Sequence, residues 1–331
     1  MRRVRTALRL MGAVALTLGL GWPPPALEAG PLDLPPATGI SPGDILIYDS
    51  FNDWVKFDPV SDQLFSLPWD DRFFSSVERF VLDLDGSILT VNSSFGRSLE
   101  RLHPITGLVT TLRPSFPSVG DFEILPNGDL LAAIPGSGGA LLRYSRQTGS
   151  LTALPKPPQF SPYSIAVTHT GDTYILDHFR GLQQVDLTTG TLTDVAGAEL
   201  EQTWGSLKVL PDGDLAYGKA NGIYRFDPAT GVESLLSGPF SGGLDRLATD
   251  EFGNVWASNF NGLYFINGVT GESTLRLPRP SVFSPHIMLV VPLDWTPPPV
   301  PEPSSIALSA LGLMCTCRRK CRSSAKARSA A

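Results

Sequence analysis

Residues 207–231 read LKVLPDGDLAYGKANGIYRFDPATG: an apolar strand, a turn at Gly213, a second strand, a loop at 219–222 and a third strand that ends in DPATG. The same order recurs around six glycines, with steps of 43, 42, 43, 42 and 40 residues between them. They are Gly43, Gly86, Gly128, Gly171, Gly213 and Gly253. A repeat of about 42 residues that holds this long predicts six equivalent structural units.

Each unit is predicted to contain four antiparallel strands. Apolar residues lie six and four positions before the repeat glycine, as at Leu207 and Val209, which is typical of a strand buried on one face. The third strand ends in a turn where Asp227 can bond the turn amides and Gly231 accepts the left-handed conformation that closes a hairpin. A fourth apolar stretch follows at 232–236.

Six four-stranded units at this spacing predict an all-β fold, a six-bladed β-propeller over residues 43–295. The first unit has no inner strand before Gly43, whereas the segment PHIMLVVP (285–292) follows the sixth unit without a partner. Ile287 and Leu289 fit the apolar positions of the missing strand. We therefore predict that this C-terminal strand pairs into blade one and closes the ring, which removes an open sheet edge.

The repeats resemble the NHL and SMP-30/gluconolactonase-like propellers, and the streptogramin-lyase-like ones, through units such as 207–231. The resemblance covers residues 43–292. Its motifs consist of turn and strand residues, so it implies the fold and says little about activity.

The N-terminal 29 residues are predicted to be a secretory signal peptide. Four arginines precede an apolar run at 10–20, and small residues follow at 26–30. The apolar run is short for a bilayer span. Residues 30–42 form a proline-rich lead-in to the propeller.

The C-terminus has a different composition: a proline-rich spacer at 296–305, then an apolar segment and a basic tail at 306–331. The order resembles the PEP-CTERM sorting signal of exported bacterial proteins, whose matching residues are Pro301, Glu302, Pro303, Arg318, Arg319 and Lys320. The resemblance implies an exosortase-type sorting enzyme as partner and delivery to the cell surface, outer membrane or extracellular matrix. An apolar segment before cations is also typical of transient membrane anchoring. The alternative is an ordinary hydrophobic tail with a polar end.

The charge and the cysteine content exclude several classes of function. Residues 30–299 contain 16 Lys and Arg against 30 Asp and Glu, so nucleic acid is not expected as a partner. All three cysteines, Cys315, Cys317 and Cys321, lie in the tail, which excludes a disulfide framework or thiol nucleophile in the propeller. Motifs of common catalytic sites are missing as well, and no catalytic residue is predicted.

A ligand site is expected at the channel rim, where the inner strands begin. The candidate binding residues there are Glu78, Arg79, Asp121, Asp245, Arg246 and His286. The carboxylates of Glu78, Asp121 and Asp245 could hold calcium or another divalent cation, or they could pair with the two arginines as an ion-pair ring. The SMP-30 resemblance implies a metal held by a glutamate at such a position, and Glu78 occupies a comparable place.

The loops between second and third strands are a second candidate locus. These loops, 49–53, 92–97, 177–181, 219–222 and 259–262, are rich in Asn, Asp, Ser and Gly, and four carry a phenylalanine: Phe51, Phe95, Phe179 and Phe260. An aromatic ring beside amides suits a carbohydrate. The alternative is that the phenylalanines fill gaps between blades.

Two functions of different class follow. The first is a non-enzymatic surface or matrix protein that binds a partner, such as exopolysaccharide or another surface protein. The second is an SMP-30/gluconolactonase-like metal-dependent hydrolase or lactonase.

Overall fold

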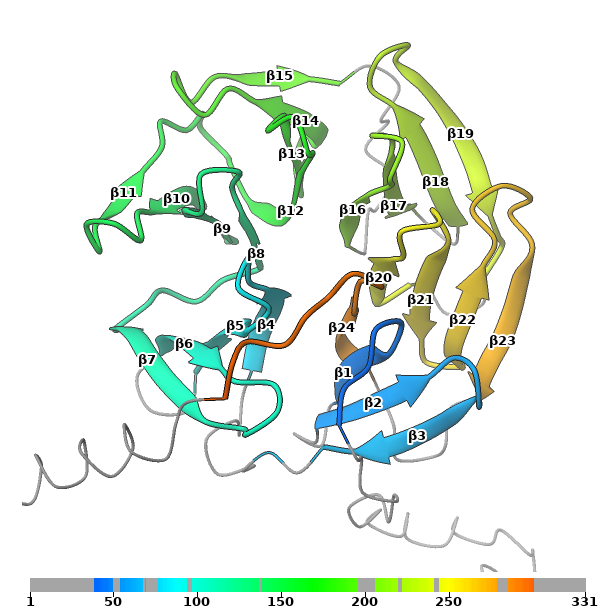
Figure 1. The fold of residues 1–331 in the computed structure, drawn as a ribbon. Coiled ribbons are helices and arrows are strands. Elements are labelled where there is room, and N and C mark those ends of the chain that lie inside the picture. The colour runs from blue at the N-terminus through cyan, green and yellow to red at the C-terminus, as the bar shows by residue number, and fades with distance from the viewer. Residues whose placement is uncertain are drawn as a thin grey trace, which may run out of the picture.

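The computed structural model describes residues 39–300 except 50–53, 68, 70–76, 94–96, 137, 196–205, 220–221, 241–243 and 279–284. The described chain forms six four-stranded antiparallel sheets, arranged as blades around a central channel (Figure 1). The predicted fold, an all-β six-bladed propeller, is confirmed. The predicted signal peptide and the tail at 306–331 lie outside the described residues.

The strands of each blade run outward from the channel in the following order. Blade one contains β24 (Pro285–Val290), β1 (Ile45–Asp49), β2 (Trp54–Asp58) and β3 (Gln63–Ser66). Blade two contains β4 (Val77–Leu82), β5 (Ile88–Asn92), β6 (Ser98–Leu102) and β7 (Val109–Pro114). Blade three contains β8 (Asp121–Ile124), β9 (Leu130–Ile134), β10 (Ala140–Tyr144) and β11 (Leu151–Ala153).

The other three blades repeat this arrangement. Blade four contains β12 (Pro162–Val167), β13 (Thr173–Asp177), β14 (Gly181–Val185) and β15 (Leu192–Asp194). Blade five contains β16 (Leu207–Val209), β17 (Leu215–Lys219), β18 (Gly222–Asp227) and β19 (Val232–Ser237). Blade six contains β20 (Arg246–Thr249), β21 (Val255–Asn259), β22 (Gly262–Ile266) and β23 (Ser273–Pro278).

The ring closes through β24, as predicted. This strand pairs antiparallel with β1, and Ile287 lies opposite Tyr48. Ile287 is buried in a cluster with Tyr48, Trp54 and Phe80, which joins blade one to blade two. The C-terminal strand therefore completes both the first sheet and the packing between the first two blades.

The core consists of six apolar clusters, and each cluster joins two neighbouring blades. Aromatic rings fill the seam between blades one and two, where the Trp54 ring lies 4.9 Å from Trp69 and 4.8 Å from Phe80 between centroids. Each blade thus buries both of its faces, and this burial is the main stabilising term available to a ring without disulfides.

The turns confirm the chemistry that the sequence predicts. The carboxylate of Asp227 accepts hydrogen bonds from the backbone N–H of Ala229 at 2.8 Å and from the Thr230 hydroxyl at 2.7 Å. Gly231 closes the turn at φ 71° and Gly213 closes the preceding one at φ 93°. Both values lie in the left-handed region that glycine adopts without a steric penalty.

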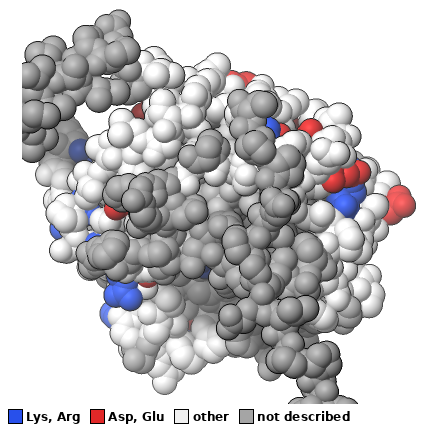
Figure 2. Space-filling view, turned by 90° about the horizontal axis from the view of Figure 1, so that it is seen from below, with Lys and Arg blue, Asp and Glu red and all other residues white. Residues whose placement is uncertain are grey.

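Alternation of strand direction gives the ring two distinct faces. On one, the loop face, the inner strands begin and the second strand of each blade connects to the third. On the other, the glycine face, the first strand turns into the second at the repeat glycine of blades two to six, and Gly43 lies just before β1 of blade one. Figure 2 shows the flank at the bottom of Figure 1, where the described basic and acidic side chains are scattered in small groups.

After β24 the chain crosses the glycine face as an extended segment, residues 291–300, which we call the strap (orange in Figure 1). The Trp295 indole donates a hydrogen bond to the Gly86 carbonyl at 3.0 Å, and a His103 ring nitrogen lies 3.4 Å from the Pro299 carbonyl oxygen. The first half of the predicted spacer, residues 296–300, therefore lies against blade two instead of extending freely from the domain.

Candidate functional site

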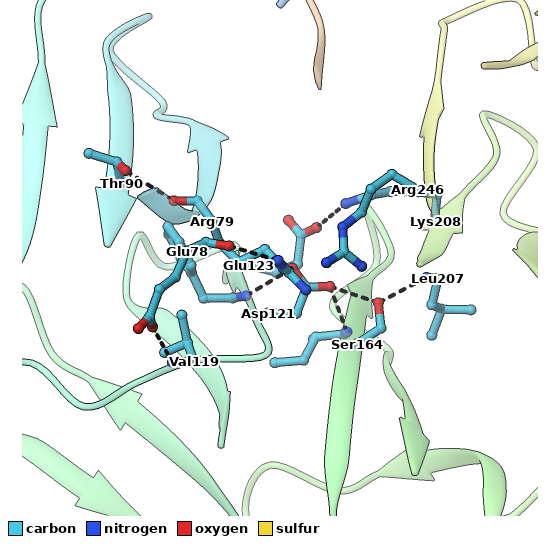
Figure 3. A network of polar contacts seen from close by, with 12 residues as sticks. Glu78, Arg79, Thr90, Val119, Asp121, Glu123, Ser164, Leu207, Lys208 and Arg246 are labelled. Carbon is cyan, nitrogen blue, oxygen red and sulfur yellow. Dashed lines mark hydrogen bonds and ion pairs between the residues drawn. The ribbon is translucent and has the colours of Figure 1, made fainter. Parts of the chain in front are cut away.

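Side chains from four inner strands converge in the channel near the loop face (Figure 3). They occupy positions seven or five before a repeat glycine, so the two-residue period of a strand aims them at the same side. The five charged ones are Arg79 on β4, Asp121 and Glu123 on β8, Lys208 on β16 and Arg246 on β20. We call these five residues the channel cluster.

Asp121 links four blades. One of its carboxylate oxygens accepts hydrogen bonds from the Ser164 hydroxyl at 2.7 Å and from the backbone N–H of Ile165 at 3.2 Å. The Ser164 hydroxyl in turn accepts one from the backbone N–H of Leu207 at 2.9 Å. The other carboxylate oxygen lies 3.8 Å from the Arg79 guanidinium. Blades two to five are thus tied together around one carboxylate.

Glu123 and Lys208 form a second connection across the channel, from blade three to blade five. The Lys208 Nζ lies 2.9 Å from the Glu123 Oε1, and each side chain is 23% exposed. Burial opposes the charge of Lys208, but the carboxylates of Glu123 and Asp121 outweigh it and raise the Lys208 pKa. Lys208 is therefore a cation at neutral pH.

Arg79 and Arg246 bring two further positive charges to the same space. Burial and then the charge of Arg246 lower the pKa of Arg79 to about 9, although Asp121 and Glu78 oppose the shift. Burial also lowers the pKa of Arg246, against Asp121 and Asp245. The pKa of Arg79 stays above neutral pH. The channel cluster contains three basic and two acidic side chains, and burial raises the pKa of Glu123 against the charge of Lys208.

The other predicted rim residues point elsewhere. The Glu78 carboxylate accepts hydrogen bonds from Arg97, from the Ser118 hydroxyl and from the Val119 N–H, at 3.2, 3.0 and 2.8 Å. Asp245 is exposed at the rim, and its carbonyl accepts a hydrogen bond from Arg246. His286 belongs to β24, and its side chain lies outside the described part of the molecule.

Glu78, Asp121 and Asp245 are therefore not brought together as one set of oxygen ligands. Among the residues that the structure describes, no group of three or more His, Cys, Asp or Glu side chains is placed to hold a metal ion. The calcium or other divalent-cation site stays a prediction.

Glu123 and Lys208 were not among the rim residues expected from the sequence. Glu78 and Asp245 lie eight positions before a repeat glycine and flank the channel. The members of the channel cluster lie seven or five positions before a repeat glycine. The signal that could have identified Glu123 and Lys208 is a charged residue five positions before the repeat glycine, in an inner strand that is otherwise apolar.

Two of the predicted aromatic residues are solvent-exposed on the loop face. Phe179 is 49% exposed and Phe260 is 48% exposed, so these two rings do not fill gaps between blades. The loop of Phe179 is held by buried Asp177, whose carboxylate accepts hydrogen bonds from the N–H groups of Ser161, Phe179 and Arg180. Phe51 and Phe95 lie outside the described residues.

The glycine face carries a feature that the sequence did not predict, a groove of about 810 Å³ near the seam of blades six and one. Its lining includes Trp256, Phe252 and Leu293, together with Lys56 and Asp44, which form an ion pair at 2.9 Å. Within the described ranges, no helix is long and apolar enough to cross a bilayer.

A comparison with protein families matches residues 299–322 to the PEP-CTERM protein-sorting motif. This motif implies export, sorting to the cell surface and processing by an exosortase. The match begins at Pro299, within the strap, so the sorting motif starts where the chain leaves blade two. No curated protein matches the sequence.

Solved structures of other propellers are similar in fold. Virginiamycin B lyase from Staphylococcus aureus has 14% identity and a TM-score of 0.51, over 68% of this chain and 78% of that one. A chain of the nidogen/laminin complex has 11% identity and a TM-score of 0.62, over 75% and 98%. A gluconolactonase from Xanthomonas campestris has 16% identity and a TM-score of 0.54, over 78% and 90%. At such identities the likeness concerns the fold alone. The chain is thus a propeller similar to the SMP-30/gluconolactonase, virginiamycin B lyase and nidogen propellers, and it carries a PEP-CTERM sorting motif.

Proposed function

We propose that the protein is a non-enzymatic binding or structural propeller that works at the outer membrane, cell surface or extracellular matrix. One observation carries the proposal: Glu78, Asp121 and Glu123 are each bonded to donors of the protein itself. A hydrolase needs carboxylates that are available to a metal or to substrate. Here they connect the blades, which suits a rigid scaffold.

The fold and the charge are consistent with a role in binding. A chain of the nidogen/laminin complex has this fold, so a propeller of this shape takes part in at least one protein complex. An acidic domain at the cell surface is a poor ligand for nucleic acid. We therefore propose an exopolysaccharide or a surface protein as the partner, and an exosortase-type enzyme as the partner during sorting.

The alternative, an SMP-30/gluconolactonase-like metal-dependent hydrolase, differs in its response to metals. Thermal unfolding of the purified full chain, with and without calcium or zinc, separates the two functions, because a ligand that binds only the folded state raises Tm. We expect no metal-dependent shift. A rise in Tm that is lost in Glu78→Gln and kept in the exposed control Glu272→Gln would establish the metal site and contradict a purely binding role.

A screen of surface glycans with the same protein tests the binding role itself. We expect a bound glycan that is recovered chemically unchanged. Turnover of a bound lactone or glycan would contradict the proposal.

A further inference from the structure

We propose that the groove on the glycine face binds a small apolar molecule that carries a positive charge, such as an alkylammonium. The inference does not depend on the partner proposed above, because it concerns a separate site and another class of ligand. The groove, of about 810 Å³, extends from the turn after β2 in blade one across blade six to blade five, and the strap forms one of its walls. These three blades follow one another around the ring (Figure 1).

The walls of the groove are mainly apolar. Trp256 is 4% exposed and Phe265 is partly buried, and their ring centroids lie 5.1 Å apart at the bottom of the groove. Phe252 is 69% exposed and Leu293 is half-exposed, so both remain available at its edge. A hollow of this size, with apolar and aromatic walls and a few polar groups, is the usual form of a small-molecule site. Burial of these surfaces would supply the affinity for the apolar part of the ligand.

Hydrogen bonds of the backbone hold the wall that the strap provides. The Leu293 N–H donates to the Glu251 carboxylate at 3.1 Å, which ties the strap to blade six. The Gly43 N–H donates to the Val291 carbonyl at 2.8 Å, and the Val291 N–H donates to the Asp44 carbonyl at 2.9 Å. Because this wall is formed in the absence of ligand, binding does not have to order it.

The charges in the lining favour a cation. Four carboxylates and two basic side chains line the groove: Asp44, Asp58, Asp250 and Glu251 against Lys56 and Arg276. Lys56 pairs with Asp44 at 2.9 Å, and Arg276 pairs at 2.5 Å with Asp62, which does not belong to the lining. Negative charge therefore exceeds positive charge by two in the lining, and by three when Asp62 is counted.

The hydrogen bonds of these carboxylates do not remove their charge. Asp58 accepts hydrogen bonds from the Ser61 hydroxyl at 2.7 Å and from the Val60 N–H at 2.8 Å. These neutral donors hold the pKa of Asp58 below its ordinary value, so the group is ionised at neutral pH. The carboxylates of the lining attract an ammonium group and repel an anionic one.

The aromatic side chains add to the preference for a cation. The face of an aromatic ring attracts a positive charge, and quaternary ammonium groups are recognised in this way. The Arg276 guanidinium already lies 5.9 Å from the Trp256 ring centroid, so this ring accepts a cation of the protein itself. The exposed ring of Phe252 is available to a cation of the ligand.

The test is calorimetric titration of the purified full chain with three probes, at concentrations at which they form no micelles. Octyltrimethylammonium has the apolar body and the positive charge, octyl sulfate has the same body with a negative charge, and tetramethylammonium has the charge alone. Octyltrimethylammonium is expected to bind about tenfold more tightly than either of the other two. Binding to the tail is common to all variants, so it cancels when variants are compared.

Two variants test the apolar walls. Phe252→Ala and Leu293→Ala are each expected to weaken the binding of octyltrimethylammonium by about fivefold, because apolar surface at the edge of the groove is lost. Phe179→Ala removes a half-exposed ring on the loop face and is the matched control, with no expected change.

A double variant tests the charge. Glu251→Gln with Asp58→Asn removes two negative charges but keeps an oxygen acceptor at each position. Octyltrimethylammonium is expected to bind it about fivefold more weakly, and octyl sulfate is expected to bind it more tightly than the wild type. A gain in anion binding also shows that the groove is folded. Glu272→Gln with Asp186→Asn, an exposed glutamate and a turn aspartate outside the groove, is the matched control.

The proposal is overturned if octyltrimethylammonium does not bind, or if octyl sulfate or tetramethylammonium binds as tightly as it does. It is also overturned if Phe252→Ala and Leu293→Ala bind octyltrimethylammonium as well as the wild type does. An unchanged preference for the cation in the double variant would contradict the role of the carboxylates and would overturn it too.

Discussion

Gly86 and Gly213 occupy equivalent turns but have different neighbours. Both have positive φ, 81° and 93°. A Cβ atom on Gly86 would lie 2.2 Å from the backbone oxygen of Thr296 in the strap, whereas a Cβ on Gly213 would meet nothing within 4 Å. One turn glycine thus serves the backbone conformation alone, and the other also admits the strap.

Substitution of these two glycines separates the effect of the left-handed backbone from the effect of the contact with the strap. Gly213→Ala is expected to cost ~1–2 kcal/mol of unfolding free energy, from the left-handed backbone alone. Gly86→Ala is expected to cost more and to release the strap, since the Thr296 backbone cannot remain in place. Urea unfolding measures the first effect, and proteolysis within 291–300 measures the second. Equal stability losses with an intact strap in both variants would contradict the contact.

The turn aspartates predict that the free energy of unfolding depends on pH in the acidic range. The Thr230 hydroxyl and then the turn amides hold the pKa of Asp227 below its ordinary value, and Asp186 and Asp58 share this arrangement with Thr189 and Ser61. Because the folded-state pKa lies below the unfolded one, the stabilisation is present above about pH 4 and is lost as pH falls through the folded value.

Urea unfolding between about pH 2 and pH 6 measures this effect, because that interval spans the ordinary pKa of an aspartate. The wild-type unfolding free energy is expected to decrease toward low pH, and Asp227→Asn is expected to decrease less steeply, since it lacks one of the titrating groups. Identical slopes for the two proteins would show that this turn does not contribute.

At the scale of single elements, the closing strand β24 buries Ile287 against blade two and Met288 against blade six, and Leu289 is partly buried. Ile287 is 4% exposed in the cluster of Tyr48 and Trp54, and Leu289 packs at the edge of that cluster. Ile287→Ala is expected to cost about 2–5 kcal/mol of unfolding free energy, the range for a buried aliphatic side chain. Leu289→Ala is the matched control and is expected to cost less. Equal losses on urea unfolding would argue against the inter-blade packing of β24.

The elements that the sequence predicts correctly are those defined by local or periodic signals. The turn at Asp227 and the alternation in the inner strands lie within a few residues, and the closure by Ile287 follows from counting strands in a repeat. Contacts between remote residues leave no such signal. Glu123 and Lys208 are 85 positions apart, and Trp295 and Gly86 are 209 apart. Both contacts depend on side-chain directions that only the closed ring defines.

The candidate site could likewise be predicted only in part from the sequence. The sequence placed Arg79, Asp121 and Arg246 at the rim because their distance from the repeat glycine is constant. It also placed Glu78 there, whose carboxylate instead bonds Ser118 and Val119. A shift of one residue along a strand reverses the face to which a side chain belongs, so rim position alone does not identify the channel residues.

At the scale of the whole molecule, the two faces of the ring have different roles. The strap leads the chain from β24 across the glycine face to His103, and the described structure ends at Val300 on that side. The channel cluster, Phe179 and Phe260 belong to the loop face. The chain therefore leaves the described structure on the glycine face, opposite the loop face to which the channel cluster belongs.

Delivery of the propeller to the cell surface through its tail is tested most directly by the mass and location of the mature protein in its own cells. The wild-type protein is expected at the surface or in the matrix, with a mass that corresponds to cleavage near residues 301–303. Glu302→Ala combined with deletion of Arg318, Arg319 and Lys320 is expected to retain the tail and to lose surface localisation. Unchanged mass and unchanged localisation in that variant would contradict sorting through this motif.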